Sequence, residues 1–390
     1  MKNVYMDHAS ATPVHREVIE AMLPYFHEFF GNPSTVYDMG SKIKGVIEEQ
    51  RAKVASLIGA KPNQIIFTSS GAEANNLAIK GVVFAKQKKG NHIIISSIEH
   101  HSVLNTARFF ERMDYEVSLL PVDKQGLVDP DRLANAIRPE TIMASIMHAN
   151  NEIGTIEPVS ELAAICRERG VIFHTDAVAT VGNIPVNVNE LNVDLLSLSG
   201  VSLGAPKGIG ALYFRDKVRL MPLIHGGIQE SGRRGGTENI PAIVGLGKAS
   251  ELASQGLADQ MNHVEGLRNL LVAGIHERVD QIVETGHPDR RLPGHASFCA
   301  AAIEGEALIF MLNAEGICAN TGSACASKAL KTSPVLVAIG IPPDLAQGSI
   351  VFTLDSSNTV DEVEYVLDKF SFAVEKLRSL SPIWREQKAA

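Results

Sequence analysis

Between residues 64 and 213, short runs of apolar and β-branched residues alternate with longer segments of helical periodicity. The short runs predict strands, and the longer segments predict helices, including one that begins at Ser102 and one over 159–169. The strand-like runs cover 64–68, 92–100, 115–123, 140–150, 171–177, 194–199 and a final stretch that ends at Tyr213. This alternation predicts an α/β fold, a mostly parallel sheet sandwiched by helices on both faces. Ligands bind such sheets at the C-terminal ends of the strands.

The flanking segments predict the rest of the architecture. An extended arm covers 1–15, and amphipathic patterns predict helices over 16–30 and 40–58. A loop rich in glycine and arginine, 225–239, precedes long and terminal helices expected over 240–278 and 360–379. We expect a large α/β domain over 16–258, and a small α+β domain formed by 1–15 and 259–390.

Composition limits the class of protein. The 390 residues are 45% hydrophobic and 21% charged, with a net charge of −8, which is typical of a globular protein with a large core. No basic block supports direct nucleic-acid binding. The N-terminal residues lack the apolar run of a signal peptide, and no stretch approaches the roughly 18 apolar residues that span a membrane. We therefore expect a cytoplasmic protein without membrane attachment.

The four cysteines are too few and too scattered for a disulfide framework, and they form no CxxC pair. Cys166 lies in a helical pattern and Cys299 in a strand-like run, so both are expected in the core. Cys318 follows an isoleucine and is also expected to pack inside. Cys325 differs because the small residues around it, Ser323-Ala324-Cys325-Ala326-Ser327, leave a thiol accessible.

Several motifs in order and spacing resemble those of cysteine desulfurases of the NifS/IscS type, class V aminotransferases of the pyridoxal phosphate (PLP) fold type I. The resemblance covers nearly the whole chain and implies a large domain with a mostly parallel, seven-stranded type of sheet. In such enzymes a Ser-Gly-His-Lys turn carries the lysine that holds PLP as a Schiff base. A loop cysteine then takes the substrate sulfur as a persulfide, and alanine is released. Here the turn reads Ser199-Gly200-Val201-Ser202, so serine stands at the lysine position.

The ring-binding group that the resemblance implies is mostly present. His100 matches the ring-stacking histidine, and Asp176 matches the carboxylate that pairs with the pyridine nitrogen. Asn151 matches a residue near the phenolic oxygen, whereas Ala179 replaces a glutamine that contacts the same oxygen. Alone, Asp176 could be a helix cap and His100 an ordinary polar strand-end residue. The three in register favour an inherited PLP-shaped pocket in which His100 is also a candidate catalytic residue.

Fewer of the phosphate-binding residues that the resemblance implies are present. Gly71 offers a backbone N–H, Ser199 offers a hydroxyl, and Thr237 matches a threonine that reaches the neighbouring subunit's phosphate. Ala72 stands in the cofactor-binding position usually held by threonine, and Val201 replaces a histidine. Each replacement removes a hydrogen bond to a charged acceptor, worth roughly 1.5–3 kcal/mol. We therefore expect PLP to bind non-covalently and weakly, or not at all.

The substrate-binding group is also altered. Relatives carry an arginine that binds the substrate carboxylate in a segment that here reads Ser349-Ile350-Val351-Phe352. Valine cannot bind a carboxylate, and Asp355 nearby would repel one. Lys207 matches an additional lysine of the family, and its side chain would have to reverse direction across a turn to replace the missing one. By contrast, the loop around Cys325 resembles the sulfur-carrying loop.

Two classes of function remain open. The first is a desulfurase-like protein that is not self-sufficient and retains Cys325 as a persulfide carrier or iron–sulfur ligand, with a sulfur acceptor or scaffold protein as partner. No other metal ligand is identified. The second is an active enzyme, either a weak desulfurase with non-covalent PLP or one with altered chemistry; a regulatory subunit of a competent desulfurase is a further alternative. The Thr237 loop predicts a homodimer or pairing with a lysine-bearing relative.

Overall fold

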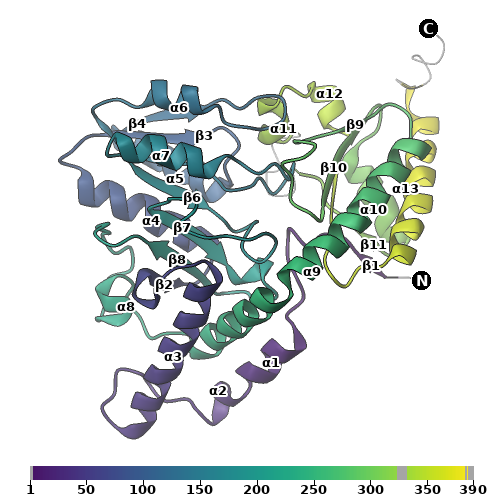
Figure 1. Cartoon of the computed structure of the whole chain (residues 1–390). Coiled ribbons are helices and arrows are strands. Elements are labelled where there is room, and N and C mark those ends of the chain that lie inside the picture. The colour runs from purple at the N-terminus through teal and green to yellow at the C-terminus, as the bar shows by residue number, and fades with distance from the viewer. Residues whose placement is uncertain (1–2, 323–331, 383, 385–390) are drawn as a thin grey trace.

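The computed structural model describes residues 3–322, 332–382 and 384. Two parts lie on either side of the long helix α9, Ile240–Arg278, which runs obliquely between them (Figure 1). The helix has the bounds that the sequence pattern predicts. Cys325 falls outside the described residues.

The larger part is built on a seven-stranded sheet, with the strands in the order β2-β8-β7-β6-β5-β3-β4. Strand β8 is antiparallel to both of its neighbours, and the other pairs are parallel. The predicted mostly parallel sheet is therefore confirmed. Its strands are β2 Ile65–Thr68, β3 His92–Ser96, β4 Glu116–Leu120, β5 Thr141–Ser145, β6 Ile172–Asp176, β7 Leu195–Ser199 and β8 Gly210–Phe214.

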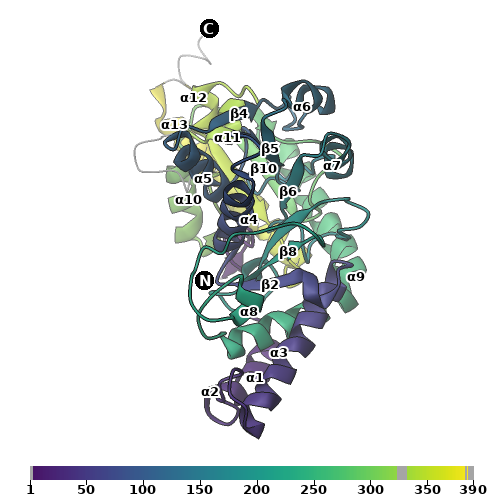
Figure 2. The ribbon, with the colours of Figure 1, turned by 90° about the vertical axis from the view of Figure 1, so that its left-hand side faces the viewer.

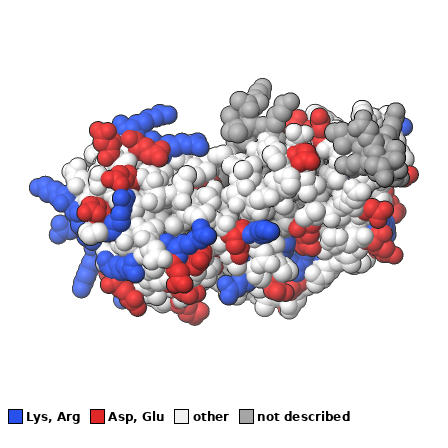
Figure 3. All heavy atoms as spheres, turned by 90° about the horizontal axis from the view of Figure 1, so that it is seen from above, with Lys and Arg blue, Asp and Glu red and all other residues white. Residues whose placement is uncertain are grey.

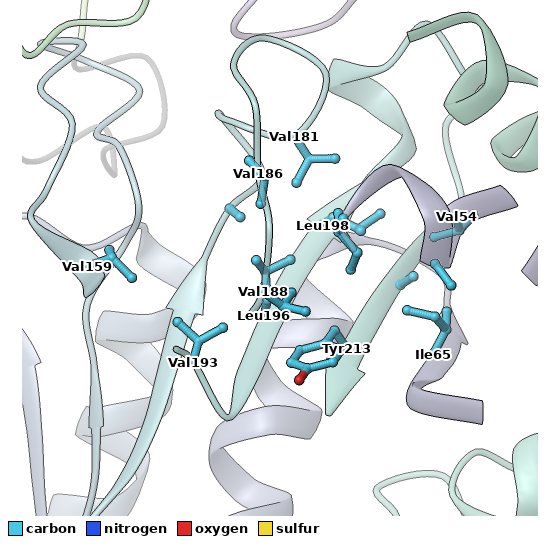
Figure 4. Packing of buried hydrophobic residues seen from close by; sticks show 14 of the residues in the cluster. Val54, Ile65, Val159, Val181, Val186, Val188, Val193, Leu196, Leu198 and Tyr213 are labelled. Carbon is cyan, nitrogen blue, oxygen red and sulfur yellow. The ribbon is translucent and has the colours of Figure 1, made fainter. Parts of the chain in front are cut away.

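Helices cover both faces of this sheet (Figures 1 and 2). Side chains of a strand alternate between the two faces. Thus Leu195 packs in the core beneath α4 and α5, whereas Leu196 and Leu198 pack with Val54 and Tyr213 on the other face (Figure 4). The helices are α4 Gly71–Lys86 and α5 His101–Glu111 on the first face, with α3 Asp38–Leu57, α6 Pro130–Ala136 and α7 Val159–Glu168 on the second.

The prediction of a single helix over 16–30 is wrong. The expected single helix over 16–30 is two short helices, α1 Arg16–Met22 and α2 Pro24–His27. Proline has no N–H to donate and its ring clashes with the preceding turn, so Pro24 ends one helix and begins the next. The pattern of apolar residues did not register this break.

The smaller part contains an antiparallel sheet in the order β12-β10-β9 and a short parallel pair, β1 with β11. Its core joins the end of α9 to buried phenylalanines of the sheet and of α13. The terminal helix lies where the sequence predicts it. We propose a domain boundary near 258, which falls within α9. The remaining elements are β1 Val4–Tyr5, β9 Ile282–Glu284, β10 His295–Ala300, β11 Ile317–Cys318, β12 Ser349–Thr353, α8 Gln229–Gly232, α10 Gly305–Ala314, α11 Pro334–Ala338, α12 Pro343–Ala346 and α13 Val360–Leu380, with 3₁₀ turns η1 Pro62–Gln64 and η2 Gly200–Ser202.

The N-terminal arm ties the two parts together. The Ala9 N–H donates to Thr353 Oγ1 of β12 at 2.8 Å. Thr12 Oγ1 donates to the Val201 carbonyl at 2.6 Å and accepts from the Gly204 N–H at 3.0 Å. The arm therefore links the small sheet to the turn in which serine replaces lysine.

The surface seen from above carries basic and acidic side chains interspersed over the molecule (Figure 3). In the described part of the chain, no helix combines the length and apolar character needed to cross a bilayer.

Candidate functional site

A cavity of about 510 Å³ lies where the strand ends of the large sheet meet the small part. All but two of the sequence-predicted site residues line it. These are Gly71, Ala72, His100, Asn151, Asp176, Ser199 and Ser202. Thr237 does not line it, and Cys325 lies outside the described residues. The parallel strands thus bring together side chains that are far apart in the sequence, while their chemical roles remain predictions.

Asp176 is the most constrained acid of the cavity. It ends β6 with only 5% exposure, and its Oδ1 accepts from the Val178 N–H at 2.9 Å. Its Oδ2 accepts from Asn75 Nδ2 at 2.6 Å. Burial raises the pKa of this carboxyl, whereas the Val178 hydrogen bond, the nearby His100 charge and the Asn75 hydrogen bond oppose the increase. An ordered carboxyl with these partners can bind a protonated ring nitrogen.

His100 has a structural role in addition to its predicted chemical one. Its Nδ1 accepts from the Ser102 N–H at 3.2 Å and caps α5. The Ser102 hydroxyl lies 2.7 Å from the same nitrogen. Because Nδ1 accepts from the backbone, the neutral ring carries its proton on Nε2. The sequence leaves a helix cap open as an alternative for Asp176, but the capping residue here is His100, which also lines the cavity.

The two neighbouring asparagines divide their roles. Asn150 is buried, and its Oδ1 accepts from the N–H groups of Glu152 and Ile153 at 2.8 and 3.0 Å. Asn151 is half-buried and lines the cavity. Asn150 thus stabilises the turn that carries Asn151, the residue that the family resemblance names as a cofactor-binding candidate.

The start of α4 forms another wall of the cavity. A β-carbon at Gly71 would lie 2.6 Å from Val178 Cγ2 and 3.4 Å from the Ser199 β-carbon, so only glycine fits between them. The first N–H groups of a helix lack intrahelical partners and favour an anion. The exposed Ala72 adds no hydroxyl to this wall.

The turn after β7 carries Ser202 at the position where the sequence resemblance predicts a lysine. Ser202 ends the 3₁₀ turn η2, and its hydroxyl donates to the Ser199 carbonyl at 3.2 Å. A hydroxyl cannot form the imine that a lysine amine forms. Lys207 also lines the cavity and is exposed, so it is the lysine against which covalent attachment must be tested.

The strand β12 contributes an apolar wall. Val351 is 5% exposed, and its backbone bonds to that of Asn320 in both directions, at 2.7 and 3.1 Å. Asp355, just beyond the strand, lines the same cavity. No arginine is among the described residues that line this space.

Thr237 lies in a separate hollow of about 170 Å³ that shares Ser69, Gly208 and Ile209 with the main cavity. Its loop is fixed by a buried ion pair, in which Arg51 Nη1 and Nη2 donate to the two Glu230 oxygens at 2.7 and 2.9 Å. The threonine is exposed. It therefore lines the smaller hollow and not the main cavity.

The described cysteines differ in access. Cys166 and Cys299 are buried as expected, and burial raises the pKa of both thiols to about 12. Cys318 is only partly buried, because it lies on the two-residue strand β11 near the N-terminal arm. The expectation that Cys318 packs inside is therefore wrong. No cluster of three or more His, Cys, Asp or Glu suited to a metal occurs among the described residues.

Two buried polar residues at the cavity wall were not identified from the sequence. Glu99 is 3% exposed and accepts from Ser96 Oγ and the Met147 N–H. Burial holds the pKa of its carboxyl well above the usual value. Asn75, the partner of Asp176, lies one helical turn after Gly71. That spacing in the helix could have indicated it.

Comparison with known proteins agrees with this geometry. The family model described as aminotransferase class-V matches residues 4–366. The chain is 49% identical over 387 residues to the cysteine desulfurase IscS of Dictyoglomus turgidum, covering 99% of this chain and 98% of that protein. It is 50% identical over 382 residues to the cysteine desulfurase IscS of Methanosarcina thermophila, covering 98% and 94%.

A solved structure described as a NifS-like protein superposes with a TM-score of 0.91 at 35% identity, covering 96% of this chain and all of that one. The sequence identity, the coverage and the shared fold agree. The chain belongs to the class V aminotransferases and, within them, to the NifS/IscS-like cysteine desulfurase family of PLP fold type I.

Proposed function

We propose that this protein handles sulfur in sulfur transfer or iron–sulfur cluster biogenesis, through Cys325, without being a self-sufficient desulfurase. The observation that supports this most directly is Ser202, which ends the turn beside the cavity and bonds to Ser199 instead of offering an amine. The names of its relatives support a role in sulfur chemistry.

The walls of the cavity support non-covalent binding of PLP. Asp176 and His100 would hold the ring, while Gly71 and Ser199 would hold the phosphate. Within the described residues, Asn75 Oδ1 and Glu99 Oε2 are buried without a hydrogen-bond partner, as is expected of a wall built for a polar ligand. When bound, PLP supplies an electron sink for amino-acid chemistry. The missing lysine and the alanine and valine at positions 72 and 201 predict weak binding.

In the proposed reaction the Cys325 thiolate attacks the terminal sulfur of a donor persulfide. The S–S bond of the donor breaks, a new S–S bond forms on Cys325, and the donor leaves as a thiolate. Electrons and atoms balance without an added oxidant. An acceptor or iron–sulfur scaffold protein would then take the sulfur.

A transfer assay tests this function. A competent desulfurase is supplied with ³⁵S-cysteine and this protein, and the label is mapped after alkylation. We expect label on Cys325, loss of it in Cys325→Ser, and retention in the matched control Cys318→Ser. Absence of label from Cys325 would refute the sulfur-carrier function.

A second candidate, a weak desulfurase using non-covalent PLP, is favoured by the persistence of the cavity itself. Without a lysine to move protons, it would lose about 10²–10⁴ in rate. Alanine released from cysteine by the purified protein with added PLP would support this candidate. A role as regulatory subunit would instead require a mixed dimer with a competent relative.

We also propose a cytoplasmic homodimer. Large apolar side chains are exposed along α1, α2, the following loop and the start of α3, namely Ile19, Leu23, Phe26, Phe29, Phe30, Val36, Tyr37 and Met39. Such a concentration is typical of a protein interface. Light scattering should give a dimer that Phe26→Asp/Phe30→Asp dissociates and Phe372→Asp, on the exposed side of α13, does not. A monomeric native protein would contradict the proposal.

A further inference from the structure

The carboxyl groups and the one lysine of the cavity belong to different structural elements. Among its described lining residues, Lys207 is the only lysine or arginine. Lys207 lies in the loop that leads into Ile209 and Gly210. This loop runs close to the start of α4, because a β-carbon at Gly210 would lie 2.7 Å from the backbone of Ser70. We call this wall, formed by Ser69–Ala72, Ser199 and Lys207, the α4 wall. Its helix N-terminus and its lysine both favour an anion.

The second wall has the reverse character. We call it the β12 wall: Asp7, His8, Val351, Thr353 and Asp355, all of which line the cavity. It is a connected structure. Asn320 Nδ2 donates to Asp7 Oδ1 at 3.2 Å, and the backbone of Asn320 pairs with Val351. The arm and the strand β12 thus hold two carboxylates beside an apolar side chain.

His8 indicates that this wall is built to meet a ligand. It is 8% exposed, and neither ring nitrogen makes a hydrogen bond of good geometry among the described residues, although the Tyr5 backbone lies near the ring. Burial lowers the pKa of the His8 imidazole, and so favours the neutral ring, against the opposing effects of the nearby carboxylates and of the Tyr5 backbone. A buried polar ring without partners is costly unless it acquires a partner. The wall therefore offers hydrogen-bonding capacity without positive charge.

Acids at this wall retain acceptor capacity for an amine. Asp355 Oδ1 accepts from the Ser356 hydroxyl and the Ser357 N–H at 3.1 and 3.2 Å. These bonds orient the carboxylate without neutralising it by a cation. A carboxylate brought to this wall would meet Asp355 and an uncharged Val351, whereas an amine would meet an oriented acceptor.

We propose that the cavity binds a phosphorylated aromatic ligand whose phosphate lies at the α4 wall and whose group at the β12 wall is an amine or uncharged, not a carboxylate. The site would thus reject free α-amino acids as the group attached to the ring. This inference depends on the non-covalent PLP-type pocket of the proposed function and is independent of Cys325.

Three probes with the same phosphopyridoxyl group test the proposal: the reduced adducts of ethylamine, L-alanine and 1,2-diaminoethane. Beyond the shared nitrogen, the ethylamine adduct carries only a methyl group, the L-alanine adduct carries a carboxylate, and the 1,2-diaminoethane adduct carries a second amine. Titration calorimetry on the purified full-length protein should show the alanine adduct binding about tenfold or more weakly than the ethylamine adduct. The diaminoethane adduct should bind at least as tightly as the ethylamine adduct.

Two variants show which residues set the preference. Val351→Arg should reverse the order of the alanine and ethylamine adducts, while Val360→Arg adds the same charge at an exposed position outside the cavity and should leave the order unchanged. If Val351→Arg does not fold, Asp355→Asn gives an independent test. It should remove most of the advantage of the diaminoethane adduct.

The proposal is overturned if the native protein binds the alanine adduct as tightly as the ethylamine adduct, or if none of the three adducts binds at millimolar concentration. The proposal is also overturned if Val351→Arg folds and neither it nor Asp355→Asn changes the order in which the three adducts bind. If Cys325 fails to accept sulfur while the predicted order holds, the sulfur-carrier function fails and this inference stands.

Discussion

The ring side and the attachment side of the cavity have diverged in different ways. On the ring side, Asp176, Asn75 and His100 form hydrogen-bonded groups at the end of β6 and the starts of α4 and α5. On the attachment side, Ser202 and Val351 stand where the family resemblance predicts a lysine and an arginine, and their side chains cannot form an imine or pair with a carboxylate. In the proposed function, the first set positions a ring, whereas the second does not supply the covalent and substrate contacts of a self-sufficient desulfurase.

In the proposed function, a cofactor pocket persists although its covalent and substrate contacts are gone. The ring-side residues also stabilise the fold, since His100 caps α5 and Asp176 bonds to the backbone beyond β6. A binding function can therefore outlast the reaction.

The largest expected effect comes from rebuilding the attachment side. Ser202→Lys alone should allow covalent capture of PLP but release little alanine from cysteine, because Val351 leaves the substrate carboxylate without a cation. Ser202→Lys/Val351→Arg should exceed the single variant by about 10–100-fold. Alanine release measured by chromatography checks this, with Ser202→Lys/Val360→Arg as the control for added charge. Equal activity of the single and double variants would show that position 351 matters little.

The second prediction concerns how protein stability depends on pH through Glu157, which lies in the segment that follows Asn151. Glu157 is buried and accepts from the Val128 N–H, and burial raises the pKa of its carboxyl to about 8. The folded protein then holds a proton that the unfolded chain releases above about pH 4.5. Stability should fall as pH rises from about 4.5 to 8, by up to about 1.4 kcal/mol per pH unit.

Glu157→Gln should flatten this pH dependence, whereas Glu161→Gln, at an exposed position on α7, should not. Urea unfolding at several pH values between 4 and 9 gives the comparison. An identical slope in the native protein and Glu157→Gln would show that Glu157 is not the group responsible.

The third prediction tests the ring side directly. Asp176→Asn keeps one acceptor but places an amide donor opposite Asn75 or the Val178 N–H, so the free energy of unfolding should fall by about 1–3 kcal/mol. PLP affinity should fall by about tenfold, because an amide does not carry the charge that pairs with a ring nitrogen. Fluorescence titration measures the affinity. Unchanged affinity in a folded variant would remove Asp176 from the proposed site.

The last prediction concerns the phosphate contacts and affects PLP affinity alone. Val201→His restores a donor at the turn and should raise PLP affinity by about tenfold. Val337→His, exposed on α11, is the matched control. A gain in both variants would point to a nonspecific effect of the added imidazole.

The sequence predicts the order and type of the main elements because strand and helix periodicities in this chain are regular over whole segments. It misses the break at Pro24, where the apolar pattern continues through a change of backbone. Family motifs locate Asp176 and His100, but not Asn75, the hydrogen-bond partner of Asp176, or the partly buried setting of Cys318. Those depend on tertiary packing, in particular on how α4 meets β6 and how the N-terminal arm pairs with β11.

The most direct test of the account is intact-mass analysis of the purified protein after incubation with PLP and reduction by borohydride. Ser202→Lys serves as the positive control. The account predicts that the native protein keeps its unmodified mass while the variant gains one reduced phosphopyridoxyl group. A reduced adduct on the native protein that maps to Lys207, or to another lysine at the cavity, would contradict the claim that this chain has lost covalent PLP chemistry.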